Sequence, residues 1–569
     1  MADTDSNQLP SRGSLNGQKW TSSHGRYGQA AMDKMDKQPW TTWTSSHGQN
    51  GQGVYCPYCP WLLVHVVHGC LSMSIQVHFG PFRSIVYLSI PTTELNMTWI
   101  FIIGVGIYFL LMALIGYLAS RKVKTMEDYL IAGRSLPFYL ALPTVVATWF
   151  GAGSSMGVSG TVYSQGFYGV IADPFGCSLA LLIAGLFFAA PFRRLRLLTI
   201  SDLLGKAYGP KFERVASLIV LPFYIGTLAS QMLAMGYVFQ IVSGAQLEIG
   251  ILIGATIVVM YTISGGMWAV TLTDFIQFGL LSLGLIIILP ICFEQVQDSQ
   301  AVLNTFLGEF KTIIPDSGQP SFSWWAYSGR ILMTGLGAIM GQDLLQRFLA
   351  SRSENVARYS GVVGAVAYMA LGLIPLFIGI AGREIYPSLE TPEHLIPLLA
   401  KEYLSPIAFT LFACGLFSAI MSTADSYLLA GTTLVTNNVI LKLRPVSNEK
   451  NKIRILRLVN LTVSLIALAL AFSGQSIFNM MVHSGTILFV AIFVPASAAL
   501  FWKGANTPSA WLSVVIGIVG WLGFIYFGGE VNEDLLFAGA SFGALSSLIA
   551  YVVTSLVRPL FSTKVIVRG

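Results

Sequence analysis

The sequence predicts an all-α polytopic membrane protein with about thirteen membrane-spanning helices. Of its 569 residues, 54% are hydrophobic and only 11% are charged, whereas soluble domains carry about 25% charged residues. Apolar runs of about 18 or more residues, the length that crosses a bilayer as a helix, recur along the chain. Lysine and arginine gather in alternate loops between these runs, as membrane topology requires.

The first 96 residues differ from the rest of the chain. They hold five of the seven histidines and a near-repeat, WTSSHGRYGQ at 20–29 and WTSSHGQNGQ at 43–52. They show no clean helical or strand period, and the apolar patch at 60–79 is interrupted by three histidines. We expect residues 1–96 to be a disordered N-terminal extension, or a translated leader upstream of a functional start at Met97.

The remaining chain divides into a transmembrane domain, residues 97–557, and a short tail, residues 558–569. Thirteen segments of the domain have the length and hydropathy of spans. Their approximate bounds are 98–119, 138–160, 168–190, 215–243, 248–264, 267–292, 325–346, 356–381, 405–439, 454–473, 477–502, 508–527 and 534–556.

Basic residues set the expected orientation. They follow the first, third, seventh, ninth and last spans, and those after the seventh are Arg347, Arg352 and Arg358. By contrast, loop 293–324 holds only Lys311 and loop 528–533 holds none. Because positively charged loops stay in the cytoplasm, an odd number of spans places the N-terminus outside and the C-terminal tail in the cytoplasm. We expect a multi-pass protein of the plasma membrane or the bacterial inner membrane. The net charge of +6 needs no nucleic acid to explain it.

The cysteines and the motif content exclude several classes of protein. Cys56 and Cys59 form CPYC without the second ligand pair that a zinc site needs, and no P-loop is present. Cys177, Cys292 and Cys414 lie in or next to apolar segments and are expected to pack in the core. We therefore expect neither an enzyme nor an ATP-driven pump, and no cofactor.

Two predicted spans are interrupted by glycine. The second contains WFGAGSSMGVSG at 149–160, and the seventh contains TGLGAIMGQDLLQR at 334–347. Glycine-broken spans at corresponding positions of two halves are typical of inverted-repeat transporters, whose binding site lies where the helices unwind. The alternative is close helix packing through small residues.

The ninth span carries an unusual polar cluster. The stretch FSAIMSTADSYLLA at 417–430 places Ser422, Thr423, Asp425 and Ser426 in five positions. Polar groups at membrane depth are costly and mark functional sites by default. The alternative is that the hydroxyls bond only to carbonyls of their own helix.

Five stretches resemble the solute:sodium symporter family. They are EDYLIAGRSLP at 127–137, ATWFGAGS at 147–154, YTISGGMWAVTLTDFIQ at 261–277, QDLLQRFLAS at 342–351 and SAIMSTADS at 418–426. The resemblance covers about residues 98–500, and GLFFAAPFR at 185–193 with MSTADS is most similar to high-affinity choline transporters.

The resemblance implies a LeuT-like core of five plus five helices, with inverted repeats at about 138–292 and 325–502. It also implies secondary active transport, in which sodium influx drives uptake of a small organic solute by alternating access. The alternatives are a transport-inactive sensor or receptor, or a passive channel, on the same fold. The expected partners are the solute, sodium and the lipid bilayer; the oligomeric state is left open.

The expected sodium site joins two spans. Sodium prefers several oxygen ligands, and the ninth span offers the carbonyl of Ala419 with the hydroxyls of Ser422 and Thr423 on one face. The family pattern adds carbonyls of Ala147 and Phe150 from the broken second span. The resemblance further places Asp274 on the sodium exit path, with helix pairing as its alternative role. Asp425, on another face, is expected to orient helices.

The substrate cavity is expected between the two broken spans. Its candidate residues are Trp149, Asp173, Gln231, Gln342 and Asp343. A tryptophan face with a nearby carboxylate suits an organic cation. Choline transporters are expected to use several aromatic residues, however, and Gly341 and Ala229 stand where two of them would be. Choline is therefore not favoured over an amino acid or another small metabolite, and Trp149 could also be a packing aromatic.

Overall fold

The computed structural model describes residues 41–44, 51–55, 62–68, 72–79, 85–311, 323–473, 477, 485–529 and 532–557, with side chains from Trp99 onward. The chain divides into two units, Met1–Asn96 and Met97–Gly569.

The first unit contains a five-stranded antiparallel sheet with strands in sequential order. The strands are β1 (Thr41–Thr44), β2 (Gly51–Tyr55), β3 (Leu62–His68), β4 (Ser72–Phe79) and β5 (Ile85–Pro91). We expected no strand period here, and the structure differs. The sequence of β3, LLVHVVH, is rich in β-branched residues, which favour strands. The structure describes only part of residues 1–96, so whether they form a disordered extension or a translated leader stays a prediction.

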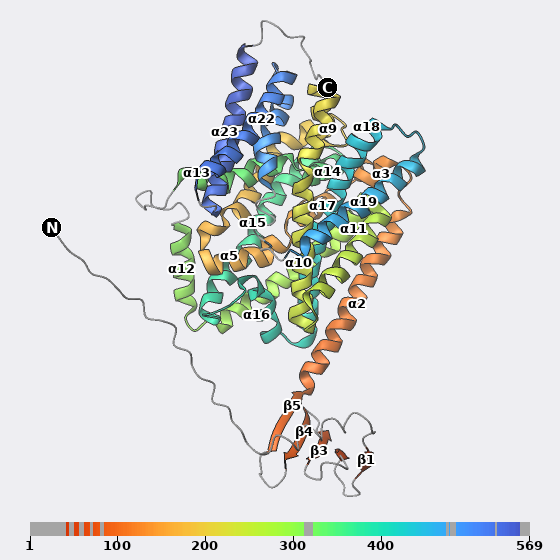
Figure 1. The fold of residues 1–569 in the computed structure, drawn as a ribbon, viewed down its shortest axis with the longest axis vertical. Helices are drawn as coiled ribbons and strands as arrows, with labels where there is room; N and C mark the ends of the chain where they lie inside the picture. The colour runs from red at the N-terminus through yellow and green to blue at the C-terminus, as the bar shows by residue number, and fades with distance from the viewer. Residues whose placement is uncertain are drawn as a thin grey trace, which may run out of the picture. The chain divides into compact units, whose positions relative to one another are not determined.

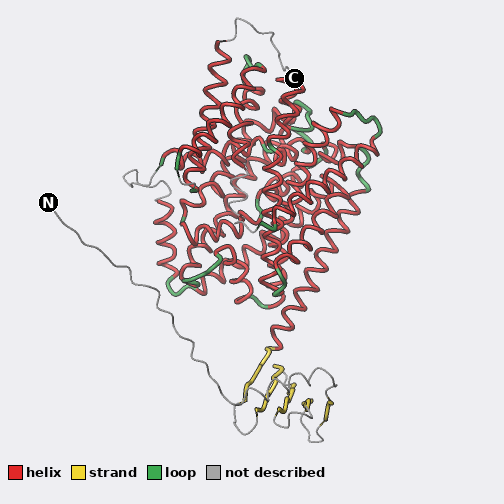
Figure 2. Tube along the Cα trace, viewed as in Figure 1, coloured by secondary structure: helices red, strands yellow, loops and turns green. Residues whose placement is uncertain are grey.

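The second unit is built from helices, which agrees with the predicted fold class (Figures 1 and 2). Its first half contains α2 (Thr92–Ser120), α3 (Met126–Ile131), α4 (Phe138–Trp149), η2 (Gly153–Gly157), α5 (Val158–Gln165), η3 (Phe167–Val170), η4 (Ile171–Gly176), α6 (Cys177–Ile183), η5 (Ala184–Phe188), α7 (Ala189–Arg194), α8 (Ile200–Tyr208), α9 (Pro210–Ile219), α10 (Leu221–Ser243), α11 (Leu247–Gln295) and α12 (Ser299–Lys311).

The second half contains α13 (Trp324–Leu332), η6 (Met333–Gly337), η7 (Ala338–Met340), α14 (Gln342–Ala350), α15 (Glu354–Ile385), η8 (Pro392–His394), α16 (Leu395–Tyr403), α17 (Pro406–Thr433), η9 (Leu434–Ile440), α18 (Leu441–Leu443), α19 (Glu449–Ala471), η10 (Leu488–Ile492), α21 (Phe493–Phe501), α22 (Thr507–Phe527) and α23 (Glu533–Val557). The hairpin of α22 and α23 follows the second predicted repeat (Figure 1).

Within the described residues, nine helices are long and apolar enough to cross a membrane. One of them, α11, has 49 residues. At about 1.5 Å per residue it exceeds twice the roughly 30 Å of a hydrocarbon core. It changes direction at Gly266, whose φ of 53° lies in the left-handed region. The kink falls between the predicted spans 248–264 and 267–292, whereas the exact count of thirteen stays a prediction.

Both predicted helix breaks are present. Helix α4 ends at Trp149 because Phe150 leaves helical geometry, with φ −79° and ψ 74°. In the second half, Gly341 adopts an extended conformation, with ψ 131°, between η7 and α14. Each interruption therefore lies inside the stretch that the glycine pattern predicted.

The two broken helices run in opposite directions. The Leu136 amide, just before α4, donates to the carbonyl of Ala350 at 2.9 Å, and the Arg352 amide donates to the carbonyl of Leu136 at 2.9 Å. The start of α4 therefore lies beside the end of α14, which is the relation that inverted repeats require.

Helix α17 lies at the centre of the bundle. Every residue from Phe412 to Leu434 is buried, so this helix contacts protein on all sides. By contrast, large apolar side chains on α2, α22 and α23 are exposed, among them Trp99, Tyr526 and Leu556. Such an outer surface suits lipid, and the polar stretch of α17 therefore faces only other helices.

Candidate functional site

The polar stretch of α17 meets the break in α4. The hydroxyl of Thr423 lies 3.4 Å from the carbonyl oxygen of Ala147. In a regular helix the Gly151 amide would donate to the Ala147 carbonyl. Here it donates to the Trp149 carbonyl at 2.9 Å instead. The break therefore leaves the Ala147 oxygen to a side chain of the second half.

The other predicted sodium ligands lie on α17 and at the end of α4. The Ser422 hydroxyl donates to the carbonyl of Ala419 at 3.0 Å, one turn earlier on the same helix face. Phe150 ends α4 and is fully buried. The cluster offers hydroxyl and main-chain oxygens without a histidine or a thiol, the donor set that a hard cation such as sodium prefers. Its assignment as the sodium site stays a prediction.

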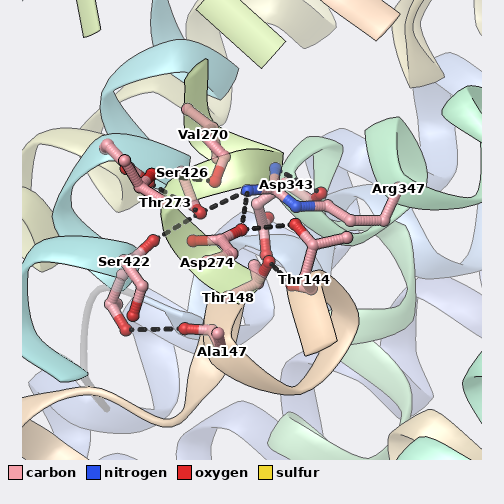
Figure 3. A network of polar contacts seen from close by, with 12 residues as sticks. Thr144, Ala147, Thr148, Val270, Thr273, Asp274, Asp343, Arg347, Ser422 and Ser426 are labelled. Atoms are coloured by element: carbon pink, nitrogen blue, oxygen red, sulfur yellow. Dashed lines mark hydrogen bonds and ion pairs between the residues drawn. The ribbon is translucent and has the colours of Figure 1, made fainter. Parts of the chain in front are cut away.

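A buried ion pair lies next to this cluster (Figure 3). Asp274 on α11 accepts a hydrogen bond from the Thr144 hydroxyl on α4, and Arg347 Nη2 on α14 lies 3.8 Å from Asp274 Oδ2. The same guanidinium donates to the hydroxyl of Ser426 on α17. Asp274 thus joins three helices, which gives its alternative helix-pairing role a structural basis.

Arg347 lies in a helix, not in the loop where the sequence placed it. We counted it among the basic residues that follow the seventh span, but it lies within α14 and its side chain is 0% exposed. Counting charges by position along the chain cannot separate an arginine buried in the last turns of a span from one in the loop beyond it. Arg352 and Arg358, further along, still make this end basic.

Asp425 faces away from the Ala147 contact. Its carboxylate accepts a hydrogen bond from the Tyr261 hydroxyl of α11 at 2.7 Å, and the Ser426 hydroxyl lies 3.2 Å from its other oxygen. The Asp425 side chain therefore links α17 to α11, and the orienting role expected for it stays a prediction.

A cavity lies between the two broken helices. Trp149 and Asp173, two of the predicted cavity residues, line it. The cavity holds about 520 Å³ of space not occupied by protein atoms, part of it open to solvent. The described residues that complete the lining are Ala172, Cys177, Phe223, Met333, Thr334, Ala338, Tyr427, Gly485 and Leu488.

Two hydroxyl groups hold Asp173 and the main chain of Trp149 together. The Ser154 hydroxyl lies 2.5 Å from Asp173 Oδ2 and 3.0 Å from the Trp149 carbonyl oxygen. The Tyr368 hydroxyl of α15 lies 3.0 Å from Asp173 Oδ1 and 3.4 Å from the same carbonyl. The cavity wall is therefore fixed by polar contacts from both halves of the chain.

Asp343 lies behind the cavity wall. Its carboxylate accepts a hydrogen bond from the Trp149 indole nitrogen at 2.5 Å. It is absent from the described lining, so it contacts the cavity through Trp149. Asp343 is the second residue of α14, so this bond joins the two broken helices directly.

The two predicted glutamines have other partners. The Gln342 amide accepts from the Ile200 amide at 2.8 Å and donates to the Leu198 carbonyl at 3.0 Å, so it ties α14 to the start of α8. The Gln231 side chain accepts from the Ala152 amide at 3.0 Å and thereby satisfies a donor freed by the break in α4. Neither side chain lines the described cavity. Helix packing turns both side-chain amides toward main-chain groups that would otherwise lack a hydrogen-bond partner.

Sequence reasoning missed several residues of this region. Phe223 carried no signal beyond its apolar surroundings, and Tyr368 lies in an otherwise ordinary span. Tyr427 directly follows the polar cluster of the ninth span but was not singled out there. Ser154 stood inside the quoted motif ATWFGAGS, and polarity at membrane depth could have singled it out. Arg347 stood inside QDLLQRFLAS, but it follows the predicted end of the seventh span and therefore looked like a loop residue.

The sodium:solute symporter family model matches residues 129–517 of the chain. Among curated relatives, the human high affinity choline transporter 1 is 27% identical over 441 residues, which are 73% of this chain and 75% of the relative. The sodium/proline symporter of Staphylococcus aureus is 26% identical over 497 residues, which are 82% of this chain and 94% of the relative.

Two solved structures share the fold. A Na+-coupled sialic acid symporter in a substrate-bound outward-open state superposes with a TM-score of 0.70 at 21% identity, covering 81% of this chain and 98% of that chain. A nucleobase-cation-symport-1 family transporter in a closed conformation gives a TM-score of 0.50 at 14% identity, covering 76% and 96%. At these identities the likeness concerns the fold alone.

Proposed function

The chain belongs to the sodium:solute symporter family, and from this premise we propose that it couples sodium influx to uptake of a small organic cation by alternating access. The contact between Thr423 and the Ala147 carbonyl carries the sodium part of the proposal. It brings a hydroxyl from one half of the fold to an oxygen that a helix break has freed in the other half. An ion that binds both groups stabilises their approach.

The coupling ion would be held by the carbonyl oxygens of Ala147, Phe150 and Ala419 and by the hydroxyls of Ser422 and Thr423. These ligands come from α4 and α17, which belong to opposite halves. Alternating access then requires that one half rocks against the other around this site. Asp274, next to the site through Thr144, is proposed to lie on the path by which sodium leaves.

The cavity favours a cationic solute. Asp173 is the only charged residue in its described lining, and Trp149, Phe223 and Tyr427 supply three aromatic side chains. A carboxylate with aromatic faces attracts an ammonium group, whereas an anionic solute would meet Asp173 without a compensating positive charge. Several curated relatives are choline transporters. The aromatic set differs from the one we expected for choline, so we propose the organic-cation class without naming one compound.

Uptake by proteoliposomes tests the proposal. Purified full-length protein would be reconstituted and supplied with radiolabelled choline or radiolabelled L-proline, with an inward gradient of sodium or of potassium. We expect sodium-dependent accumulation of choline above its equilibrium level, and competition by other small ammonium compounds. Sodium-dependent uptake of proline alone would contradict the cation class but leave sodium coupling standing.

Protein-free liposomes and sodium at equal concentration on both sides are the controls. A passive channel would equilibrate the solute without accumulating it, and a sensor would bind it without uptake. Equal uptake with sodium and potassium gradients would contradict the sodium-coupled mechanism.

A further inference from the structure

Trp149 connects the cavity to the second broken helix. Its ring lines the cavity, and its indole N–H donates to Asp343 Oδ2 at 2.5 Å. Both side chains are buried, at 5% and 0% exposure. Water cannot easily replace a buried partner at this depth, and a hydrogen bond to a carboxylate is about twice as strong as one between neutral groups. A shift of the Trp149 ring is therefore transmitted to the Asp343 side chain.

The Asp343 carboxylate has little room to move. Its second oxygen, Oδ1, has no hydrogen-bond partner among the described residues. That oxygen lies close against Gly341, where an added Cβ would be 2.5 Å away. The position of Asp343 is consequently set by Trp149 on one side and by the extended backbone at Gly341 on the other.

Asp343 leads to the predicted sodium ligands through Arg347. Arg347 Nη1 donates to the main-chain carbonyl of Asp343 at 3.1 Å, and Nη2 donates to the Ser426 hydroxyl (Figure 3). The Ser426 hydroxyl in turn donates to the carbonyl of Ser422 at 2.6 Å. An unbroken series of buried polar contacts thus runs from the cavity wall to Ser422.

We infer that Asp343 is a positioning residue that couples occupancy of the solute cavity to sodium affinity, acting between Trp149 and Arg347. The inference rests on the proposed function. A solute that orders the Trp149 ring fixes Asp343 and Arg347, which orders Ser426 and Ser422 for sodium. Binding coupling is reciprocal, so sodium strengthens solute binding by the same factor.

A double-mutant cycle tests this series of polar contacts from Trp149 to Ser422, here called the relay, without any solute. Sodium affinity of the purified full-length protein is measured as the dependence of its thermal stability on NaCl, with KCl keeping the ionic strength constant. Trp149→Phe removes the indole N–H but keeps a ring, and Asp343→Ala removes its acceptor. Each change should weaken sodium binding by about fivefold or more, the low end of typical coupling between sites. The double variant should be no weaker than Asp343→Ala alone.

Ser154→Ala is the matched control, because it removes a hydrogen bond at the carbonyl end of Trp149 instead of the indole end. Its effect should add to that of Asp343→Ala. Additive effects of Trp149→Phe and Asp343→Ala would overturn the relay, as would unchanged sodium affinity in both. If Asp343→Ala does not fold, Asp343→Ser replaces it, since its hydroxyl is too short to reach the indole. If sodium stabilises the parent protein no better than potassium does, this result contradicts the proposed sodium coupling itself. It is obtained before any variant is compared.

Discussion

The hydroxyl of Thr423 in α17 lies 3.4 Å from the carbonyl oxygen of Ala147, two residues before the end of α4. The two residues are 276 positions apart in the chain. Each belongs to one of the two predicted repeats. An ion bound between them would act on the relative position of the repeats, which changes during alternating access in transporters built from inverted repeats.

Removing the hydroxyl of Ser422 or that of Thr423 should weaken sodium binding. One lost neutral ligand costs about 1–3 kcal/mol, which corresponds to a roughly 5- to 150-fold loss of sodium affinity. Uptake against sodium concentration, normalised to surface expression, would be measured for Ser422→Ala and Thr423→Ala. Saturating sodium should partly restore uptake. If both variants keep the parental half-saturation, the site is assigned wrongly.

Thr423→Ser is the matched control, because it keeps the hydroxyl and removes only a methyl group. In the structure Ser422 donates to its own helix, whereas Thr423 reaches α4. If the hydroxyls served only α17 itself, both alanine variants would alter folded yield without changing the sodium dependence.

Gly151→Ala should displace the break in α4 from α17. A Cβ at Gly151 would lie 2.8 Å from both Gln231 Oε1 and Thr423 Cβ and would collide with the Thr423 hydroxyl. Real Cβ atoms do not approach so closely, so the break in α4 must move away from α17. We expect a weaker sodium dependence of uptake. Gly279→Ala in α11, where no atom lies within 4 Å of the added Cβ, is the control and should retain parental uptake.

The loop between α18 and α19 should face the cytoplasm. It contains Ser447, which is exposed, and basic residues lie in it and at both ends. Ser447→Cys, in a background in which Cys56, Cys59 and Cys70 are serine, should resist a membrane-impermeant thiol reagent in intact cells. Ser299→Cys, in the predicted outer loop, should react. The opposite pattern would invert the topology of every loop.

Asp173→Asn should weaken binding of a cationic solute. The carboxylate is the only charge in the described cavity lining, so its neutralisation removes the main attraction for an ammonium group. An asparagine whose amide oxygen takes the place of Asp173 Oδ2 can still accept from the Ser154 and Tyr368 hydroxyls, which lie 2.5 and 3.2 Å from that atom, so the wall is preserved. We expect the KM for choline uptake to rise at least about tenfold, the equivalent of about 1.4 kcal/mol. An unchanged KM would argue against a cation at this carboxylate.

The glycine pattern was enough to locate both helix breaks, because the backbone at each break packs closely against other groups. An added Cβ would lie 2.8 Å from Gln231 Oε1 at Gly151 and 2.5 Å from Asp343 Oδ1 at Gly341. The positions of Gln342 and Arg347 could not be derived in the same way. Whether the Gln342 amide faces a cavity or the start of α8 depends on how α14 packs, and no local pattern records that. Arg347 was misread because a basic residue near the end of a span looks the same whether it is buried or in a loop.

The aromatic residues that line the cavity were equally difficult to predict from local sequence. Trp149 could be predicted because it adjoins a glycine break, whereas Phe223 lies on α10 within ordinary apolar sequence. Tyr427 follows the polar cluster of α17, but nothing in that cluster shows that its ring faces a cavity. Which face of such a helix meets a cavity is decided by contacts between segments about 200 residues apart. Polar residues in a membrane can be identified from sequence because each is costly there; aromatic residues carry no such cost.

Arg347 is a buried cation that lies among three aspartates, Asp274, Asp343 and Asp425. Asp274, Asp343 and Asp425 are all fully buried, and Arg347 contacts the Asp274 carboxylate and the Asp343 main chain. Removing one partner of a buried ion pair costs about 3–5 kcal/mol because the other charge is left uncompensated. Arg347→Gln leaves three carboxyl groups without a basic partner, whereas Asp274→Asn leaves Arg347 with two carboxylates nearby.

Arg347→Gln should therefore lower the thermal stability of the detergent-purified protein more than Asp274→Asn does. The double variant should recover part of the loss, since it removes one negative charge along with the positive one. Equal losses for the two single variants, with strict additivity in the double, would contradict an electrostatic role for Arg347 and leave packing as the origin of its burial.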